Sequence, residues 1–190
     1  MLKKLTALTA IVAIHAFPTQ AENLPNPFMT LKPGDITVFR QGNAYTSYIF
    51  DGNDEHGYRQ RKFQRRSPGG DSFETEWFDA EGRKTRRKLE SGEIVTLVPR
   101  GCFGIDGTCT EEARRSNGDP ITTRWVQEIS AGAIKQTVFQ RFERSGEPVW
   151  SPIVEGEFRY DAKGTYAGRW FSHVTRKHYT IERIFGPSQP

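Results

Sequence analysis

The densest groups of chemically active side chains in this sequence are two runs of basic residues. Arg59, Arg61 and Arg65 lie in the first run, and Arg86 and Arg87 lie in the second. Alternate residues of a strand point to the same face, so neighbouring strands would gather these groups into a positive surface that contacts phosphate or sulfate. Glutamates lie close to both runs in the sequence. The alternative is therefore a solvated face on which opposite charges pair.

Arg183 carries a charge on the apolar face of the C-terminal segment, two residues after Ile181. A charge on that face either reaches solvent at a rim or enters the interior, where it needs a carboxylate or a ligand. We therefore hypothesise a ligand site made of four residues from the C-terminal region: Tyr166, Arg169, Trp170 and Arg183. Aromatic walls would hold the apolar part of a ligand, and arginine would hold an anionic head group.

Motifs for catalysis and for metal binding are missing from the sequence. It contains no G-x-S-x-G nucleophile motif and no DxDxDG calcium loop. His173 and His178 could share one face of a hairpin, but zinc needs further converging ligands. We therefore predict no catalytic residue, no metal ligand and no cofactor. Acid pairs brought together from distant strands, as in glycosidases, cannot be read from a sequence, so an enzyme stays an alternative.

Cys102 and Cys109 are the only cysteines in the chain. Their spacing is not C-x-x-C, which excludes thioredoxin-like and zinc-ribbon interpretations. In an exported protein such a pair closes a small loop as a disulfide. We therefore predict a disulfide between these two residues.

The N-terminus has the features of a secretory signal peptide. Lys3 and Lys4 precede an apolar run from Leu5 to Ala16, and small residues follow up to Ala21. This pattern predicts a signal peptide over residues 1–21 and a periplasmic or extracellular protein. The apolar run is too short to span a membrane as a helix. The formal net charge of +4 for the whole chain falls to +2 without the two lysines, which argues against nucleic acid as a partner.

The remaining chain predicts one all-β domain. Residues 22–34 are rich in proline and form an extended lead-in, and residues 35–190 form the domain. Apolar and polar residues alternate most clearly from Val154 to Phe185, which is the pattern of half-buried strands. We expect an antiparallel meander of about nine or ten strands, closed as a barrel-like or sandwich structure. One short helix is predicted near residues 111–117, because Thr110 can cap it and Glu111 and Glu112 suit its first turn.

These observations favour an exported, non-catalytic protein that binds an anionic or amphiphilic ligand or associates with the cell envelope. An anionic lipid or an envelope polysaccharide is the partner that the basic runs favour. Two alternatives stay open: a hydrolase that acts on an envelope polymer, and a structural or interaction module whose core is filled by its own side chains. The sequence does not indicate an oligomeric state.

Overall fold

The computed structural model describes residues 24, 26–66, 70–116, 118–161 and 164–186. The expected signal peptide lies outside these residues. Twelve strands account for most of the described chain: β1 (Ile36–Gln41), β2 (Ala44–Asp54), β3 (Gly57–Arg66), β4 (Gly70–Phe78), β5 (Lys84–Leu89), β6 (Ile94–Val98), β7 (Gly107–Arg115), β8 (Ile121–Ser130), β9 (Ala133–Arg144), β10 (Glu147–Asp161), β11 (Gly164–Ser172) and β12 (Lys177–Phe185). A short 3-10 helix, η1 (Pro27–Met29), precedes them.

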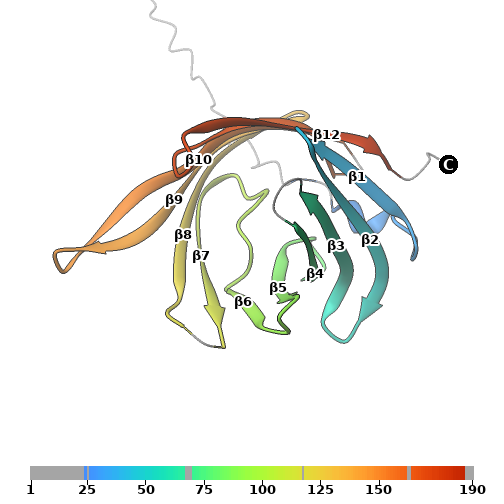
Figure 1. The fold of residues 1–190 in the computed structure, drawn as a ribbon, viewed down its shortest axis with the longest axis horizontal. Helices are drawn as coiled ribbons and strands as arrows, with labels where there is room; N and C mark the ends of the chain where they lie inside the picture. Colours follow the sequence, from blue (N-terminus) through green and yellow to red (C-terminus); the bar gives the residue numbers. More distant parts are fainter. Residues whose placement is uncertain (1–23, 25, 67–69, 117, 162–163, 187–190) are drawn as a thin grey trace, which may run out of the picture.

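The strands form a single closed barrel. Each strand pairs antiparallel with the next along the chain, and β12 pairs with β1 to close the ring (Figure 1). The expected all-β meander is therefore confirmed as a barrel, with twelve strands instead of nine or ten. Eight strands enclose an interior that side chains just fill, and more strands leave a wider lumen. Among the described residues, no helix is long and apolar enough to cross a membrane.

The predicted short helix near residues 111–117 is wrong, because β7 occupies residues 111–115. Glu111 pairs with Thr123 of β8, and Ala113 pairs with both Leu97 of β6 and Ile121 of β8. These pairings place the backbone in the middle of the sheet. Two neighbouring strands supply hydrogen-bond partners on both sides, which outweighs the local capping signals that favoured a helix.

The inner wall of the barrel differs between its two halves. On β3 and β4 it is polar and charged: Gln60 and Lys62 lie directly opposite Glu76 and Glu74. On β8 to β12 it is largely apolar and aromatic, with Trp170 paired in register with Tyr179. Because inward residues alternate with outward ones along each strand, these pairings define two walls of opposite character facing one lumen.

Residues 26–34 form a strap across one end of the barrel. The Phe28 ring is buried and packs against the rings of Phe50, Tyr58 and Phe78, with centroid distances of 5.7, 5.3 and 4.6 Å. Asn26 begins η1 as its N-cap and also donates to the backbone carbonyl of Ala80 at 2.7 Å. The expected extended lead-in is thus a packed part of the fold.

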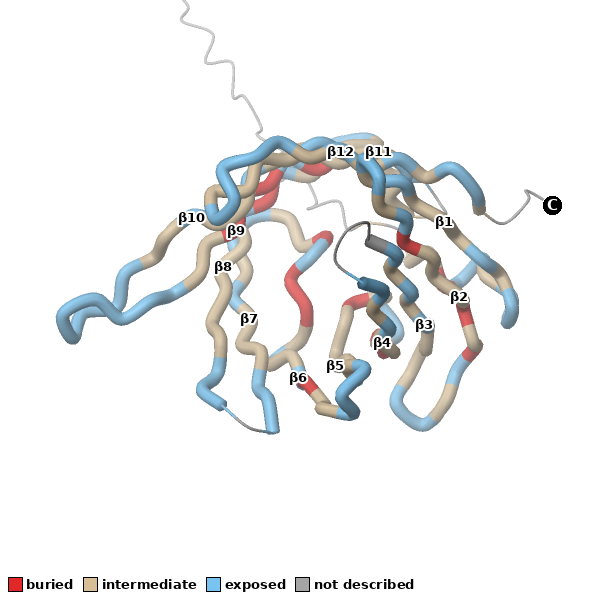
Figure 2. The backbone as a smooth tube through the Cα atoms, in the orientation of Figure 1, coloured by how far each residue is buried: buried red, intermediate tan, exposed pale blue. Residues whose placement is uncertain are grey.

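The loop between β6 and β7 turns into the barrel at the same end. Cys102 is completely buried and forms the predicted disulfide with Cys109, and Figure 2 shows this loop as a buried stretch inside the ring. The Phe103 ring reaches the inner wall, 6.2 Å from the ring of Trp125 and 6.3 Å from that of Phe158. The strap and this loop together obstruct one end of the barrel.

The hairpin of β9 and β10 extends beyond the rest of the sheet (Figures 1 and 2). Pairing between β9 and β10 continues out to Arg144 and Glu147, whereas pairing between β8 and β9 stops at Gln140. Every residue from 141 to 149 is exposed. This outer half is a two-stranded ribbon without a third strand on either side.

Candidate binding site at the open end of the barrel

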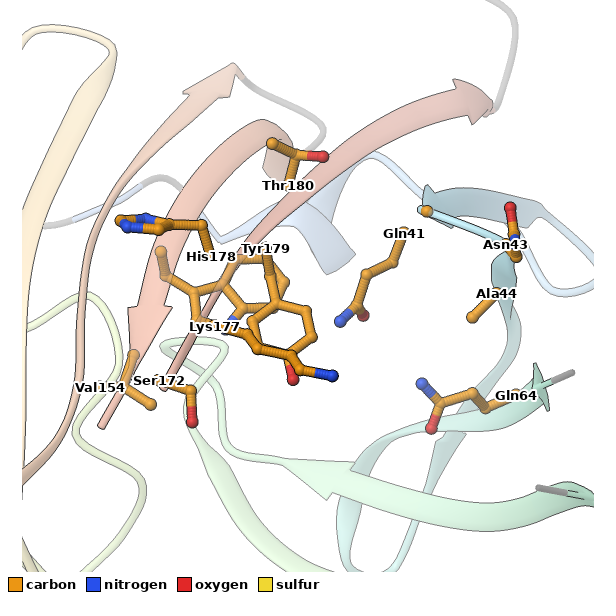
Figure 3. A pocket seen from close by; sticks show the side chains of 12 residues that line it. Gln41, Asn43, Ala44, Gln64, Val154, Ser172, Lys177, His178, Tyr179 and Thr180 are labelled. Atoms are coloured by element: carbon orange, nitrogen blue, oxygen red, sulfur yellow. The ribbon is translucent and has the colours of Figure 1, made fainter. Parts of the chain in front are cut away.

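A cavity of about 810 Å³ opens at the end opposite the strap (Figure 3). The turn between β1 and β2 and the start of β12 form its rim. Its lining comes from six strands and one turn: Gln41, Gly42, Asn43, Ala44, Gln64, Val154, Trp170, Ser172, Lys177, His178, Tyr179 and Thr180. A volume of this size is typical of sites for small molecules.

One wall of the cavity is aromatic. The rings of Trp170 and Tyr179 stack at 5.5 Å, and Phe158 stacks on the other side of Trp170 at 5.8 Å. Gly156 lies opposite Trp170 in the register. A Cβ atom at Gly156 would come within 2.5 Å of the Cβ of Trp170, so the glycine is needed where the two strands support this wall.

The opposing side of the cavity is polar. In Figure 3 the amide ends of Gln41 and Gln64 point into the cavity, toward the side that carries Tyr179. Lys177 contributes an ammonium group to the same lining. Among the described residues no carboxylate lies within ion-pair distance of Lys177, so this cation is available to a ligand. The cavity thus combines an aromatic surface, amide groups and one unpaired positive charge.

A buried network of charges lies on the polar wall of the barrel. Glu76 is 2% exposed; it accepts from Lys84 at 2.5 Å and from Gln60 at 2.8 Å. Burial alone would raise the pKa of Glu76, but Lys84, Lys62 and Gln60 together hold it below its ordinary range. Burial and the nearby carboxylates raise the pKa of Tyr48. Glu76 is therefore ionised and Tyr48 is neutral at physiological pH.

A second carboxylate, the half-buried Glu111, has the opposite shift. Burial raises its pKa, although the backbone N–H of Cys102 donates to it at 2.6 Å. Two carboxylates whose pKa values move apart are the pattern of an acid and a base. Neither Glu76 nor Glu111 lines the cavity, however. Both are held by partners within the fold, so the arrangement gives no reacting geometry at the open end.

The four predicted ligand residues do not form one site. Trp170 lines the cavity. Arg183 lies toward the strap end, where it forms an ion pair with Asp161 and lies 5.9 Å from the centre of the Tyr166 ring. Arg169 lies on the outer face, 79% exposed at its side chain, and pairs with Glu157 at 3.3 Å. The structure therefore joins Arg183 to Tyr166 and leaves Arg169 apart from both groups.

The predicted basic surface is also divided. Arg59 and Arg61 lie on β3 beside acidic residues of β2, at 3.3 Å from Asp54 and 2.9 Å from Asp51 respectively. Arg65 shares their face of β3. Arg86 lies 4.9 Å from the centre of the Trp77 ring. Its neighbour Arg87 pairs with Glu74 of the charge network at 3.8 Å, which places it inside the barrel and away from the outer basic row.

Sequence reasoning missed most of the cavity. It did not single out Gln41, Gln64, Lys177 or Tyr179 as ligand residues, because they come from strands far apart in the chain. One signal was present, since Lys177 and Tyr179 are two residues apart and so share a face of one strand. Among the described residues, no group of three or more His, Cys, Asp or Glu residues is arranged to hold a metal ion.

A scan against protein-family models finds no match, and neither do searches of curated proteins and of solved structures.

Proposed function

We propose that this chain is a binding protein that holds an anionic or amphiphilic ligand in the cavity at the open end of its barrel. The observation that carries the proposal is the pairing, in one cavity, of the stacked Trp170 and Tyr179 rings with the unpaired ammonium of Lys177. Rings bury the apolar part of a ligand at about 25 cal/mol per Å². The ammonium adds a charge-assisted hydrogen bond to an acidic group.

The open lumen favours binding over a purely structural role. In a structural module the inner rings would be buried by one another, yet Trp125, Trp170 and Tyr179 are only partly buried. Few apolar residues of the described chain are buried, and three of them, Phe28 of the strap with Phe50 and Phe78, form one cluster at the strap end. A cavity at the other end of the barrel, lined by rings that stay partly exposed, is what a ligand site requires.

The proposal includes export from the cytoplasm. The disulfide between Cys102 and Cys109 supports it, because such bonds persist in oxidising compartments. An envelope ligand would then be the natural one to reach the cavity.

Two fluorescent probes test the proposal. Anilinonaphthalene sulfonate is an anionic amphiphile, and N-phenylnaphthylamine is a neutral compound of similar shape. The wild-type protein should bind both at one site. Lys177→Met should weaken the sulfonate about tenfold, the effect of losing about 1.4 kcal/mol, and leave the neutral probe unchanged.

Lys135→Met is the matched control, because Lys135 is an exposed lysine on β9 outside the cavity lining. It should leave both affinities unchanged. Failure of the wild-type protein to bind either probe would overturn the proposal, as would equal effects of the two lysine substitutions.

A further inference from the structure

A row of inward residues that begins in the cavity lining continues around the barrel wall. It runs in register from Tyr179 through Trp170 and Gly156 to Gln136 and then Gln127. The first two of these residues line the cavity. Residues directly opposite in an antiparallel sheet point to the same face, so Gln136 faces the same lumen as the stacked rings.

Gln136 is buried but incompletely satisfied. It is 6% exposed, and its Oε1 atom has no hydrogen-bond partner among the described residues. Leaving a buried acceptor unpaired costs about 1 to 3 kcal/mol. Such a group is suited to an additional hydrogen-bond donor, such as an ordered water or a ligand hydroxyl.

The neighbouring Gln127, on the same wall, has hydrogen-bond partners for both atoms of its amide group. Its Oε1 accepts from the backbone N–H of Gly104 at 2.8 Å, and its Nε2 donates to the carbonyl of Cys102 at 2.6 Å. Gln127 thus holds the β6–β7 loop in place. Gln136 lies directly opposite it, next to the residues that line the cavity but not among them. Its Oε1 atom makes no such bond, which distinguishes it from the structural amide of Gln127.

Amide side chains are unusually frequent on the inner wall, which carries Gln41, Gln60, Gln64, Gln127, Gln136 and Gln140. An amide both donates and accepts hydrogen bonds, so it matches hydroxyl groups. Gln60 and Gln127 are bonded within the fold, whereas Gln41 and Gln64 line the cavity. An alkyl chain in the cavity would remove water from Gln41 and Gln64 without offering hydrogen bonds in its place, which is costly. The wall therefore suits a ligand rich in hydroxyls more than a lipid tail.

We propose that the ligand is an acidic saccharide whose ring packs on Trp170 and Tyr179, whose acid group pairs with Lys177, and whose hydroxyl donates to Gln136. The apolar C–H face of a sugar ring packs on an aromatic ring and is desolvated there. The amides of Gln41 and Gln64 bind further hydroxyls at the rim. This inference rests on the proposed function, because it assigns a chemical class to the ligand of the same cavity.

An array of acidic oligosaccharides tests this assignment. It carries uronate-, sulfate- and phosphate-bearing chains beside their neutral counterparts, and dodecanoate is titrated separately as an acidic alkyl ligand. The wild-type protein should retain at least one acidic saccharide more strongly than its neutral counterpart and bind dodecanoate at least tenfold more weakly. Retention of no acidic saccharide, or tighter binding of dodecanoate, would overturn the assignment.

Gln136→Leu gives the residue-level test. Leucine keeps the size of the side chain and removes the unpaired acceptor, so the fold should be as stable as wild type in a thermal melt. Saccharide affinity should fall about tenfold, while binding of anilinonaphthalene sulfonate, which has no hydroxyl, should stay the same. Thr137→Val, on the outer face of the same strand, should change neither affinity. Unchanged saccharide affinity in Gln136→Leu would contradict the role of Gln136.

The two proposals fail in different ways. If the fluorescent probes bind and the saccharides do not, the cavity binds ligands of another class and only the saccharide assignment is lost. If neither probes nor saccharides bind, both proposals are wrong.

Discussion

Glu76 is the least exposed charged side chain in the described part of the barrel, and its sequence context gives no sign of this. It alternates with Phe73, Thr75 and Trp77, a pattern that predicts a strand correctly. The usual rule would place the apolar residues inside. Here Glu74 and Glu76 point inward, because Lys62, Lys84 and Arg87 on the adjoining strands pair with them. Alternation therefore identifies a strand but cannot tell which face is inside when one wall is polar.

Replacing this carboxylate should destabilise the fold in a pH-dependent way. Glu76→Gln should lower the free energy of unfolding at pH 7 by about 2 to 3 kcal/mol, because it removes charge-assisted hydrogen bonds from a buried site. The pKa of Glu76 is lowered in the folded state. Its contribution is thus complete above about pH 4.3 and is lost as the pH falls through the folded pKa. Urea unfolding at pH 7 and pH 3.5 should show the difference from wild type shrinking in acid.

Glu111→Gln is the matched comparison, because burial raises the pKa of Glu111 instead. The ionised form of Glu111 is disfavoured in the folded state, which lowers the free energy of unfolding of the wild-type protein at neutral pH. This destabilisation disappears as the pH falls through the folded pKa of Glu111. The substitution should therefore cost less than Glu76→Gln at pH 7. Equal losses for the two variants at both pH values would contradict the opposite pKa shifts.

At the scale of elements, the strap shows that the packing of a proline-rich segment cannot be predicted from its composition. The composition of residues 22–34 predicts an extended segment without regular structure, and η1 is indeed only three residues long. Composition does not reveal that Phe28 enters a cluster with Phe50, Tyr58 and Phe78. Phe50, Tyr58 and Phe78 come from the neighbouring strands β2, β3 and β4, and the composition of residues 22–34 does not indicate that this segment packs against the ends of those strands.

Shortening the buried side chain of the strap, Phe28, should lower the free energy of unfolding of the whole domain. Phe28→Ala should cost about 3 to 5 kcal/mol, the range for removing a buried phenylalanine side chain. Met29→Ala is the control, since Met29 is the next residue and is 72% exposed; it should cost well under 1 kcal/mol. Chemical denaturation followed by circular dichroism measures both. Similar losses in the two variants would mean that the strap does not stabilise the barrel.

At the scale of the whole molecule, the sequence predicts the architecture better than the site. Tight turns such as Gly42-Asn43, between the paired residues Gln41 and Ala44, favour neighbouring antiparallel strands, and a meander follows directly. Closure of the barrel cannot be predicted from such turns, because it depends on pairing between residues far apart in the chain, such as Phe39 and Arg183. The cavity depends on that closure, since Gln41 on β1 faces Tyr179 on β12 only when the ring is complete. The site was therefore beyond reach of local patterns.

Closure of the barrel by β12 should be essential for folding, whereas the outer part of the β9–β10 hairpin should contribute little to stability. Replacing residues 142–149 with Asn-Gly would join Arg141 to Trp150, which are already paired, through a two-residue hairpin turn. This variant should melt within a few degrees of wild type. Deleting β12 instead removes a similar number of residues but leaves β1 and β11 as open edges. That variant should fail to fold, as judged by circular dichroism and gel filtration, and a soluble folded product would contradict the closed ring.

Because the strap and the β6–β7 loop lie across one end of the barrel, a ligand enters and leaves the cavity through the other end. A long polymer is then expected to insert only a terminus. Saturation by a polymeric ligand should then count chain ends and stay independent of chain length. A repeating polymer bound along its backbone would show the reverse, with more protein bound per molecule as the polymer grows.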